Sequence, residues 1–214
     1  MKRFLACAFV LVLFASISQT VNAAPMKEIL CPDDIVLNSH EMESETFECC
    51  DQKARFIAAA SVTKALHYYV QEKCAANGYE LSAIARVCVN FKEVSDGKCV
   101  AIGTIYFSCG CCVIDNPVVD DCKYDEKHCD NGAEIETSGT SQRYMCCDVD
   151  DRWNATYDTM KLLYTEADEK CSVLDCKGGL GIRGYQIDYV PVSPDDNACV
   201  VKTTLTFSCC CVCR

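Results

Sequence analysis

The sequence lacks the residue patterns on which most enzymes depend. Its three histidines, His40, His67 and His128, are scattered along the chain, and no Gly-x-Ser-x-Gly nucleophile elbow occurs. Closely spaced cysteines can ligate metals, but those of this chain do not form a clean pair of Cys-x-x-Cys motifs. We therefore expect no enzymatic activity, no cofactor and no metal site, and we expect His67, which lies in an apolar pattern, to be a packed core or boundary residue.

Positive charge is also scarce. The chain has 20 Lys and Arg against 31 Asp and Glu, a formal net charge of -11. Such a chain should repel phosphate backbones and anionic lipid, because proteins that bind either one normally present a basic face. The charge argues against nucleic-acid binding and fits cationic partners or a need for solubility.

Long apolar runs are absent beyond the first residues. Met1-Lys2-Arg3, the apolar stretch Phe4 to Phe14 and the small residues before position 24 have the pattern of a secretory signal peptide. We expect residues 1–23 to be this signal, with cleavage after Ala24 as the alternative, and no membrane span. The mature protein should then be secreted, and loss of Lys2 and Arg3 changes the net charge from -11 to -13.

Cysteine, by contrast, is abundant, with 21 residues, and removal of Cys7 with the signal leaves an even number. This density is typical of secreted disulfide scaffolds. We expect disulfides at Cys31, Cys49, Cys50, Cys74, Cys88, Cys99, Cys109, Cys111, Cys112, Cys122, Cys129, Cys146, Cys147, Cys171, Cys176, Cys199, Cys209, Cys210, Cys211 and Cys213.

The chain contains an internal duplication. Phe47 to Cys74 recurs without a gap as Tyr144 to Cys171, and Cys99 to Cys109 recurs as Cys199 to Cys209. The copies predict two cysteine-rich repeats, at residues 24–118 and 119–214.

The cysteines leave the pairing between these repeats open. Seven cysteine positions are shared, so at least one in each copy must pair with an unshared cysteine or across the copies, and Cys88 and Cys176 are the obvious partners. If Cys122 belongs to the first copy, each holds ten and could close on itself. If it belongs to the second, a bridge between the copies is required.

Each copy has the pattern of a helix followed by a hairpin, which predicts an α+β fold. Phe56, Ala60, Thr63, His67, Val70 and Cys74 form a helical stripe, and Trp153, Tyr157, Met160, Tyr164, Ala167 and Cys171 repeat it. Asp51 and Asp148 are expected N-caps, and Asn77-Gly78 is an expected helix end. Alternating residues around Val87 to Phe91, followed by Asp96-Gly97, predict a hairpin. Ser193 to Asn197 predicts a longer turn in the second copy, where Pro191 suggests an edge strand.

Two further groups of residues are candidate sites. Asn154-Ala155-Thr156 is a glycosylation sequon beside Trp153, near the start of the second predicted helix. Asp148, Asp150 and Asp151 could bind calcium, but they lack the glycine and the distant glutamate of an EF-hand, so helix capping explains them better.

The helix followed by a hairpin resembles the layout of cystatin-type protease inhibitors, although their Gln-x-Val-x-Gly loop is replaced by Gln186-Ile187-Asp188. In size and cysteine density the chain looks like the larger cysteine-rich components of invertebrate venoms and secretions. We expect a secreted, non-enzymatic binding protein, toxin-like or effector-like, that acts on extracellular proteins or receptors. The alternatives are a structural protein of an extracellular matrix, cuticle or mineralised layer, and a secreted protease inhibitor. Any distinct binding function should lie where the copies differ.

Overall fold

The computed structural model of the chain describes residues 30–32, 35–124, 133–174, 178–193 and 196–211, without the side chains of 193, 196, 197 and 210. The predicted signal peptide at 1–23, His128 and the cysteines at 129, 176 and 213 lie outside these residues.

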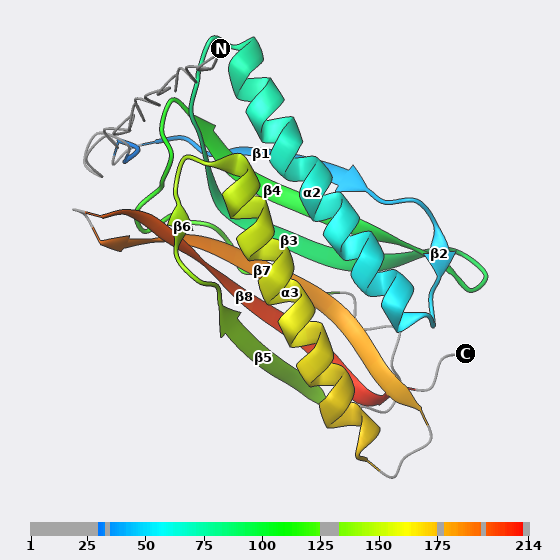
Figure 1. Ribbon diagram of the computed structural model, residues 1–214. Helices are drawn as coiled ribbons and strands as arrows, with labels where there is room; N and C mark the ends of the chain where they lie inside the picture. The colour runs from blue at the N-terminus through cyan, green and yellow to red at the C-terminus, as the bar shows by residue number, and fades with distance from the viewer. Residues whose placement is uncertain (1–29, 33–34, 125–132, 175–177, 194–195, 212–214) are drawn as a thin grey trace, which may run out of the picture.

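The fold is α+β, as predicted, with two helices on one face of an eight-stranded antiparallel sheet (Figure 1). The first copy, unit 1, contributes β1 (Asn38–Glu43), β2 (Phe47–Glu48), α2 (Gln52–Ala76), β3 (Ser82–Ser95) and β4 (Lys98–Cys109). The second copy, unit 2, contributes β5 (Glu134–Thr140), β6 (Tyr144–Met145), α3 (Val149–Ser172), β7 (Gly179–Ser193) and β8 (Asp196–Cys211). The strand order is β1-β4-β3-β7-β8-β5, with β2 beside β4 and β6 beside β8.

Both helices begin at the predicted caps. The Asp51 carboxylate accepts a hydrogen bond from the Ala54 amide, and Asp148 accepts one from the Asp151 amide, each at 2.9 Å. The first helix has Asn77 as its C-cap, and Gly78 follows with a φ of 83°, so the helix stops where the sequence predicts. The aspartates near position 148 therefore include a helix cap, and the described residues contain no group suited to a metal ion.

Each predicted hairpin is present, and the second differs in detail. Asp96-Gly97 joins β3 to β4, and Gly97 has a φ of 68°. Strand β8 already begins at Asp196, so regular pairing extends into the predicted turn. The expectation of an edge strand at Pro191 is wrong for β7, which lies between β3 and β8. The proline is tolerated because β7 pairs with β3 only between Gly184 and Asp188.

The central strand pair β3–β7 relates the two units by an approximate twofold axis. Val87 and Val89 of unit 1 correspond to Tyr185 and Ile187 of unit 2. In the sheet Val87 lies opposite Ile187, and Val89 lies opposite Tyr185. All four side chains are buried, and the buried residues of the two predicted repeats form one core cluster on the helix side of the sheet.

The helices obey the same relation and pack antiparallel. Phe56 stacks on Tyr164 with ring centroids 5.0 Å apart, and His67 meets the edge of Trp153 at 5.9 Å. Phe56 and Trp153 occupy equivalent positions, as do His67 and Tyr164. The predicted stripe is therefore a buried face in α2, whereas its aromatic members in α3 are only half-buried.

Seven disulfides join described cysteines. Unit 1 and the segment after it contain Cys31–Cys111, Cys49–Cys99, Cys74–Cys109 and Cys88–Cys122. Unit 2 contains Cys146–Cys199 and Cys171–Cys209, which match two of these bridges. Cys112–Cys147 joins the units, so they do not close separately, and Cys88 pairs with unshared Cys122 instead of a shared cysteine. This many disulfides indicates folding in an oxidising compartment.

No helix in the described part of the chain has the length and apolar character that a membrane crossing requires.

Candidate interaction groove

A groove of about 570 Å³ lies between α2 and the segment that joins β1 to β2. In Figure 1 this is where β2 lies beside the first half of α2. We call it the unit 1 groove. Its lining residues are Met42, Glu43, Ser44, Glu45, Thr46, Phe47, Ala54, Ile57, Ala58, Ser61, Val62 and Ala65.

The helical side of the groove has small side chains and one large exposed one. Ala54, Ala58, Ser61 and Ala65 follow one another at helical spacing, which leaves room above the helix backbone. Ile57 stands beside them with 52% of its surface exposed, although it is a large aliphatic residue. Ile57 and the small side chains beside it form a contiguous apolar surface that an apolar side chain of a partner can cover.

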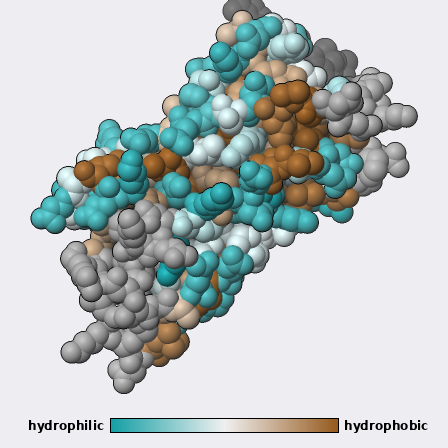
Figure 2. Space-filling view, turned by 180° about the vertical axis from the view of Figure 1, so that it is seen from behind, coloured by the Kyte–Doolittle hydropathy of each residue, from teal (hydrophilic) through white to brown (hydrophobic). Residues whose placement is uncertain are grey.

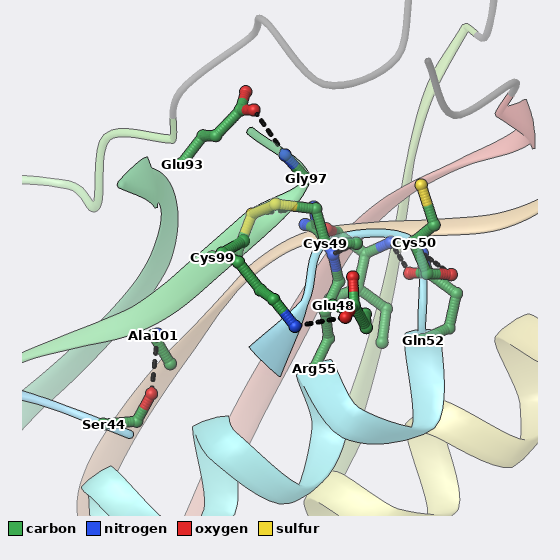
Figure 3. The surroundings of a disulfide bond; sticks show 12 residues. Ser44, Glu48, Cys49, Cys50, Gln52, Arg55, Glu93, Gly97, Cys99 and Ala101 are labelled. Atoms are coloured by element: carbon green, nitrogen blue, oxygen red, sulfur yellow. Dashed lines mark hydrogen bonds and ion pairs between the residues drawn. A yellow bond between two sulfur atoms is a disulfide. The ribbon is translucent and has the colours of Figure 1, made fainter. Parts of the chain in front are cut away.

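The opposite side of the groove is held by a short clamp. The Ser44 amide donates to the Ala101 carbonyl and the Ser44 hydroxyl accepts from the Ala101 amide, both at 2.9 Å. After β2, the Cys49–Cys99 disulfide ties the chain to β4. Figure 3 shows the bond from Ala101 to the Ser44 hydroxyl and the disulfide, with Arg55 below the chain at Cys49. The wall of the groove is therefore anchored at both ends before any partner binds.

Arg55 fixes the start of α2 against both units. Its side chain is buried and donates from Nε to the Cys49 carbonyl at 2.6 Å and from Nη1 to the Ile182 carbonyl of β7 at 2.8 Å. Its guanidinium also lies 4.9 Å from the Phe91 ring centroid. Burial lowers the pKa of Arg55 to about 10, so the group remains charged at neutral pH.

The charged residues that line the groove have one sign. Glu43 and Glu45 are exposed on its wall, and none of the lining residues is basic. A ligand segment that places an apolar side chain over Ile57 and Ala58 would bring its neighbouring residues close to these carboxylates. The groove therefore favours a ligand with an apolar anchor and nearby positive charge.

Unit 2 has the same clamp beneath a different surface. Ser141 donates to the Val201 carbonyl and accepts from the Val201 amide, both at 2.9 Å, as Ser44 does with Ala101. The equivalent pocket, the unit 2 groove, measures about 330 Å³. Its lining residues are Gln142, Arg143, Tyr144, Asp151, Ala155 and Asp158.

The helix positions explain the contrast between the grooves. Asp151 and Asp158 of α3 stand where α2 has Ala54 and Ser61, and exposed Asn154 stands where α2 has Ile57. One pair reverses the trend, because exposed Leu162 corresponds to Ala65. The first two turns of α3 thus offer charge and a sequon where α2 offers an apolar surface.

The structure places His67 in the core, as predicted. Its Nδ1 lies 2.8 Å from the Thr63 carbonyl, which only accepts, so Nδ1 donates and Nε2 accepts from the Tyr189 hydroxyl at 2.9 Å. Burial, with Arg152 as a second cause, lowers the pKa of His67 to about 3. His40, by contrast, stacks on the Tyr69 ring with centroids 3.7 Å apart, far from this network.

A larger pocket, of about 650 Å³, lies on the face of the sheet opposite the helices. Tyr106 of β4 lines it together with Ile35, Leu37 and Val119, and Figure 2 shows apolar residues gathered on this face. Residues 33 and 34, which lie outside the described part of the chain, are neighbours of lining residues Pro32 and Ile35. The groove on the helix side, enclosed by described residues, is therefore the better-defined candidate site.

From the sequence, the cysteines were expected to form disulfides and Asn154 was identified as part of a sequon, but the unit 1 groove was not predicted. A signal was present in the gap-free alignment of the copies, where alanine, isoleucine and serine at 54, 57 and 61 stand against aspartate, asparagine and aspartate. What the alignment could not supply was the opposing wall, because β1 and β2 reach α2 only through pairing with β4.

Comparison of the chain with protein-family models, with curated proteins and with solved structures finds no match, so the groove is interpreted from its own chemistry.

Proposed function

We propose that this chain is a secreted, non-enzymatic binding protein of the toxin or effector type. Its unit 1 groove takes an extracellular polypeptide segment that carries one apolar anchor and adjacent Lys or Arg residues. The single observation that supports this function is the difference between two grooves on one scaffold. Both have the same serine clamp, but only the unit 1 groove combines exposed Ile57 with a wall whose charges are all acidic.

In this proposal, burial of apolar area supplies most of the affinity, and charge orients the ligand. Burying an aliphatic or aromatic side chain against Ile57, Ala58 and Val62 would contribute about 1.5–3 kcal/mol. Glu43 and Glu45 would contribute less affinity but would orient the segment and speed its association. The preformed wall lowers the entropy cost of binding, because Ser44 and Cys49 are already held.

The test uses random peptides displayed on phage and selected against the full, oxidised chain. We expect the selected peptides to combine an apolar residue with nearby Lys or Arg. Synthetic copies should bind the Ile57→Asp variant at least tenfold more weakly, because a carboxylate would replace the apolar anchor point. The double variant Glu43→Gln/Glu45→Gln should bind them several-fold more weakly, and its binding should depend less on salt.

The matched control is Asn154→Asp, which makes the same exposed helix position acidic in unit 2. Binding of the selected peptides to this variant should be unchanged. Selected peptides that bind Ile57→Asp as tightly as the natural chain, or that are mainly acidic, would contradict the proposed function.

A further inference from the structure

Asn154 lies on the face of α3 that borders the unit 2 groove. Its side chain is exposed in the second turn of α3, where unit 1 has Ile57. On a helix, the residues three before and four after a given position lie on the same face. For Asn154 these are Asp151 and Asp158, and both line the unit 2 groove. Any group attached to the Asn154 amide therefore projects beside the mouth of that groove.

We propose that Asn154 carries an N-linked glycan that covers the unit 2 groove and leaves the unit 1 groove as the open one. The attachment is chemically complete with a lipid diphosphate-linked oligosaccharide as donor. Carbon 1 of the first sugar forms a bond to Nδ2 of Asn154, and its bond to the diphosphate oxygen breaks, with both electrons staying on the leaving lipid diphosphate. The amide releases one proton, which balances the charge gained by the diphosphate. No oxidation or reduction occurs. The proposal does not depend on what the unit 1 groove binds.

The burial of Thr156 fixes when the glycan must be added. The sequon is recognised through both its asparagine and its hydroxyl residue. In the folded protein Thr156 is fully buried, and its hydroxyl donates to the Arg152 carbonyl at 2.8 Å. The same hydroxyl lies 3.2 Å from that of Tyr189. An enzyme cannot reach this hydroxyl without unwinding the start of α3, so attachment has to precede folding.

The folded structure nevertheless accommodates the product. The glycosylated Nδ2 belongs to an exposed side chain, so the sugar extends into solvent and requires no rearrangement of the core. The hydroxyl that the enzyme needed is buried after the reaction and then serves the packing of α3 on β7. The two residues of the motif thus have separate places in the folded protein, one outside and one inside.

The first experiment asks whether and when the site is modified. The full chain is secreted from eukaryotic cells and digested, and glycosidase conversion of Asn154 to aspartate in heavy-oxygen water is read by mass. We expect modification in the natural chain and in Thr156→Ser, which keeps the hydroxyl, and none in Asn154→Gln. Purified oligosaccharyltransferase should modify the reduced, unfolded chain at least tenfold faster than the folded one.

The second experiment asks whether the glycan covers the groove. Carbodiimide labelling of carboxylates is compared between the glycosylated chain and Asn154→Gln. Asp151 and Asp158 should be labelled several-fold more slowly in the glycosylated chain, whereas Glu43 and Glu45 of the other groove should be labelled equally. An unmodified Asn154 in the secreted chain would overturn the proposal, and so would a glycan that gives Asp151 and Asp158 no protection.

Discussion

In unit 1, Ser44 bonds to Ala101 at the edge of an apolar groove, whereas in unit 2 Ser141 forms the same two bonds to Val201 at the edge of a charged one. The helix caps and two of the disulfides match as well. The backbone is thus repeated where each helix meets the sheet, and the side chains differ where each helix faces solvent. One scaffold can therefore carry two surfaces of opposite chemistry, because the scaffold bonds do not depend on those surfaces.

Substitution of the two equivalent buried arginines should give the largest difference in unfolding free energy between the units. Arg55 donates to two carbonyls, whereas Arg152 donates to the Ser82 carbonyl while its Nε and Nη2 have no described partner. Arg55→Met should lower the free energy of unfolding by about 2–4 kcal/mol, because two buried acceptors lose their donor. Arg152→Met should lower it by about 1–2 kcal/mol. Denaturant unfolding of the oxidised chain measures both, and an equal loss would show that the two arginines are energetically equivalent.

His67, at the contact between the helices, should make the stability of the protein depend on pH, whereas the equivalent residue of unit 2 should not. His67 is neutral when folded, with its pKa lowered to about 3, whereas in the unfolded chain its pKa is about 6.5. The unfolded state therefore binds the proton first, and stability is lost as pH falls from about 6.5 toward 3, by about 1.4 kcal/mol per pH unit. Unfolding measured at pH 6 and pH 4 should show a loss that is about 2–3 kcal/mol smaller in His67→Gln.

The matched control is Tyr164→Phe, since Tyr164 occupies the equivalent position. Burial raises the pKa of Tyr164, so this residue does not titrate in acid. Its removal should leave the acid dependence unchanged. If the unfolding free energy of His67→Gln fell with pH as much as that of the natural chain, the titrating group would be a residue other than His67.

Two glycines facing the helices test the packing of each unit. An added Cβ at Gly103 would lie 2.7 Å from the Leu66 Cδ1 atom, whereas at Gly139 it would make ordinary contacts of 3.4 Å with Leu163 and Thr159. Gly103→Ala should lower the unfolding free energy by about 1–2 kcal/mol through overpacking. Gly139→Ala should leave it unchanged or raise it by up to about 1 kcal/mol. Thermal unfolding of the two variants ranks them, and the reverse order would contradict the closer contact between β4 and α2 at Gly103.

The helix caps give the smallest expected difference. Asp51→Ala should lower the unfolding free energy by about 1 kcal/mol, because α2 has no other acid in its first turn. Asp148→Ala should lower it less, by about 0.5 kcal/mol, since Asp150 and Asp151 still interact with the start of α3 and no longer repel the carboxylate of Asp148. Unfolding at low and moderate salt separates the two effects. A larger loss for Asp148→Ala would rule out this explanation.

The sequence predicted what depends on local order. The helical stripes, the caps at Asp51 and Asp148 and the Asp96-Gly97 turn follow from residue spacing within one segment. Strands β1 and β2, and with them the unit 1 groove, depend on pairing with β4 many residues later, and short polar strands have little pattern of their own. The pairing of β3 with β7, which joins both hairpins into one sheet, was not predicted. The alternation of residues in β3 shows that its side chains are buried, but it does not show whether another strand pairs with its free edge.

The cysteines, too, were predictable only where local spacing was sufficient. Their spacing predicted a disulfide scaffold, but Cys112–Cys147 depends on how the units are placed, which parity could not decide.

The register of β3 against β7 makes this single chain equivalent to a homodimer whose protomers have been joined end to end. If two unit 1 segments associated without unit 2, Val87 of each would lie opposite Val89 of the other across the axis. An isolated unit would expose β3 as an unpaired apolar edge, which recruits any compatible strand. Joining the two protomers satisfies that edge at every concentration, and it allows the outer surfaces of the pair to differ, which two identical subunits cannot do.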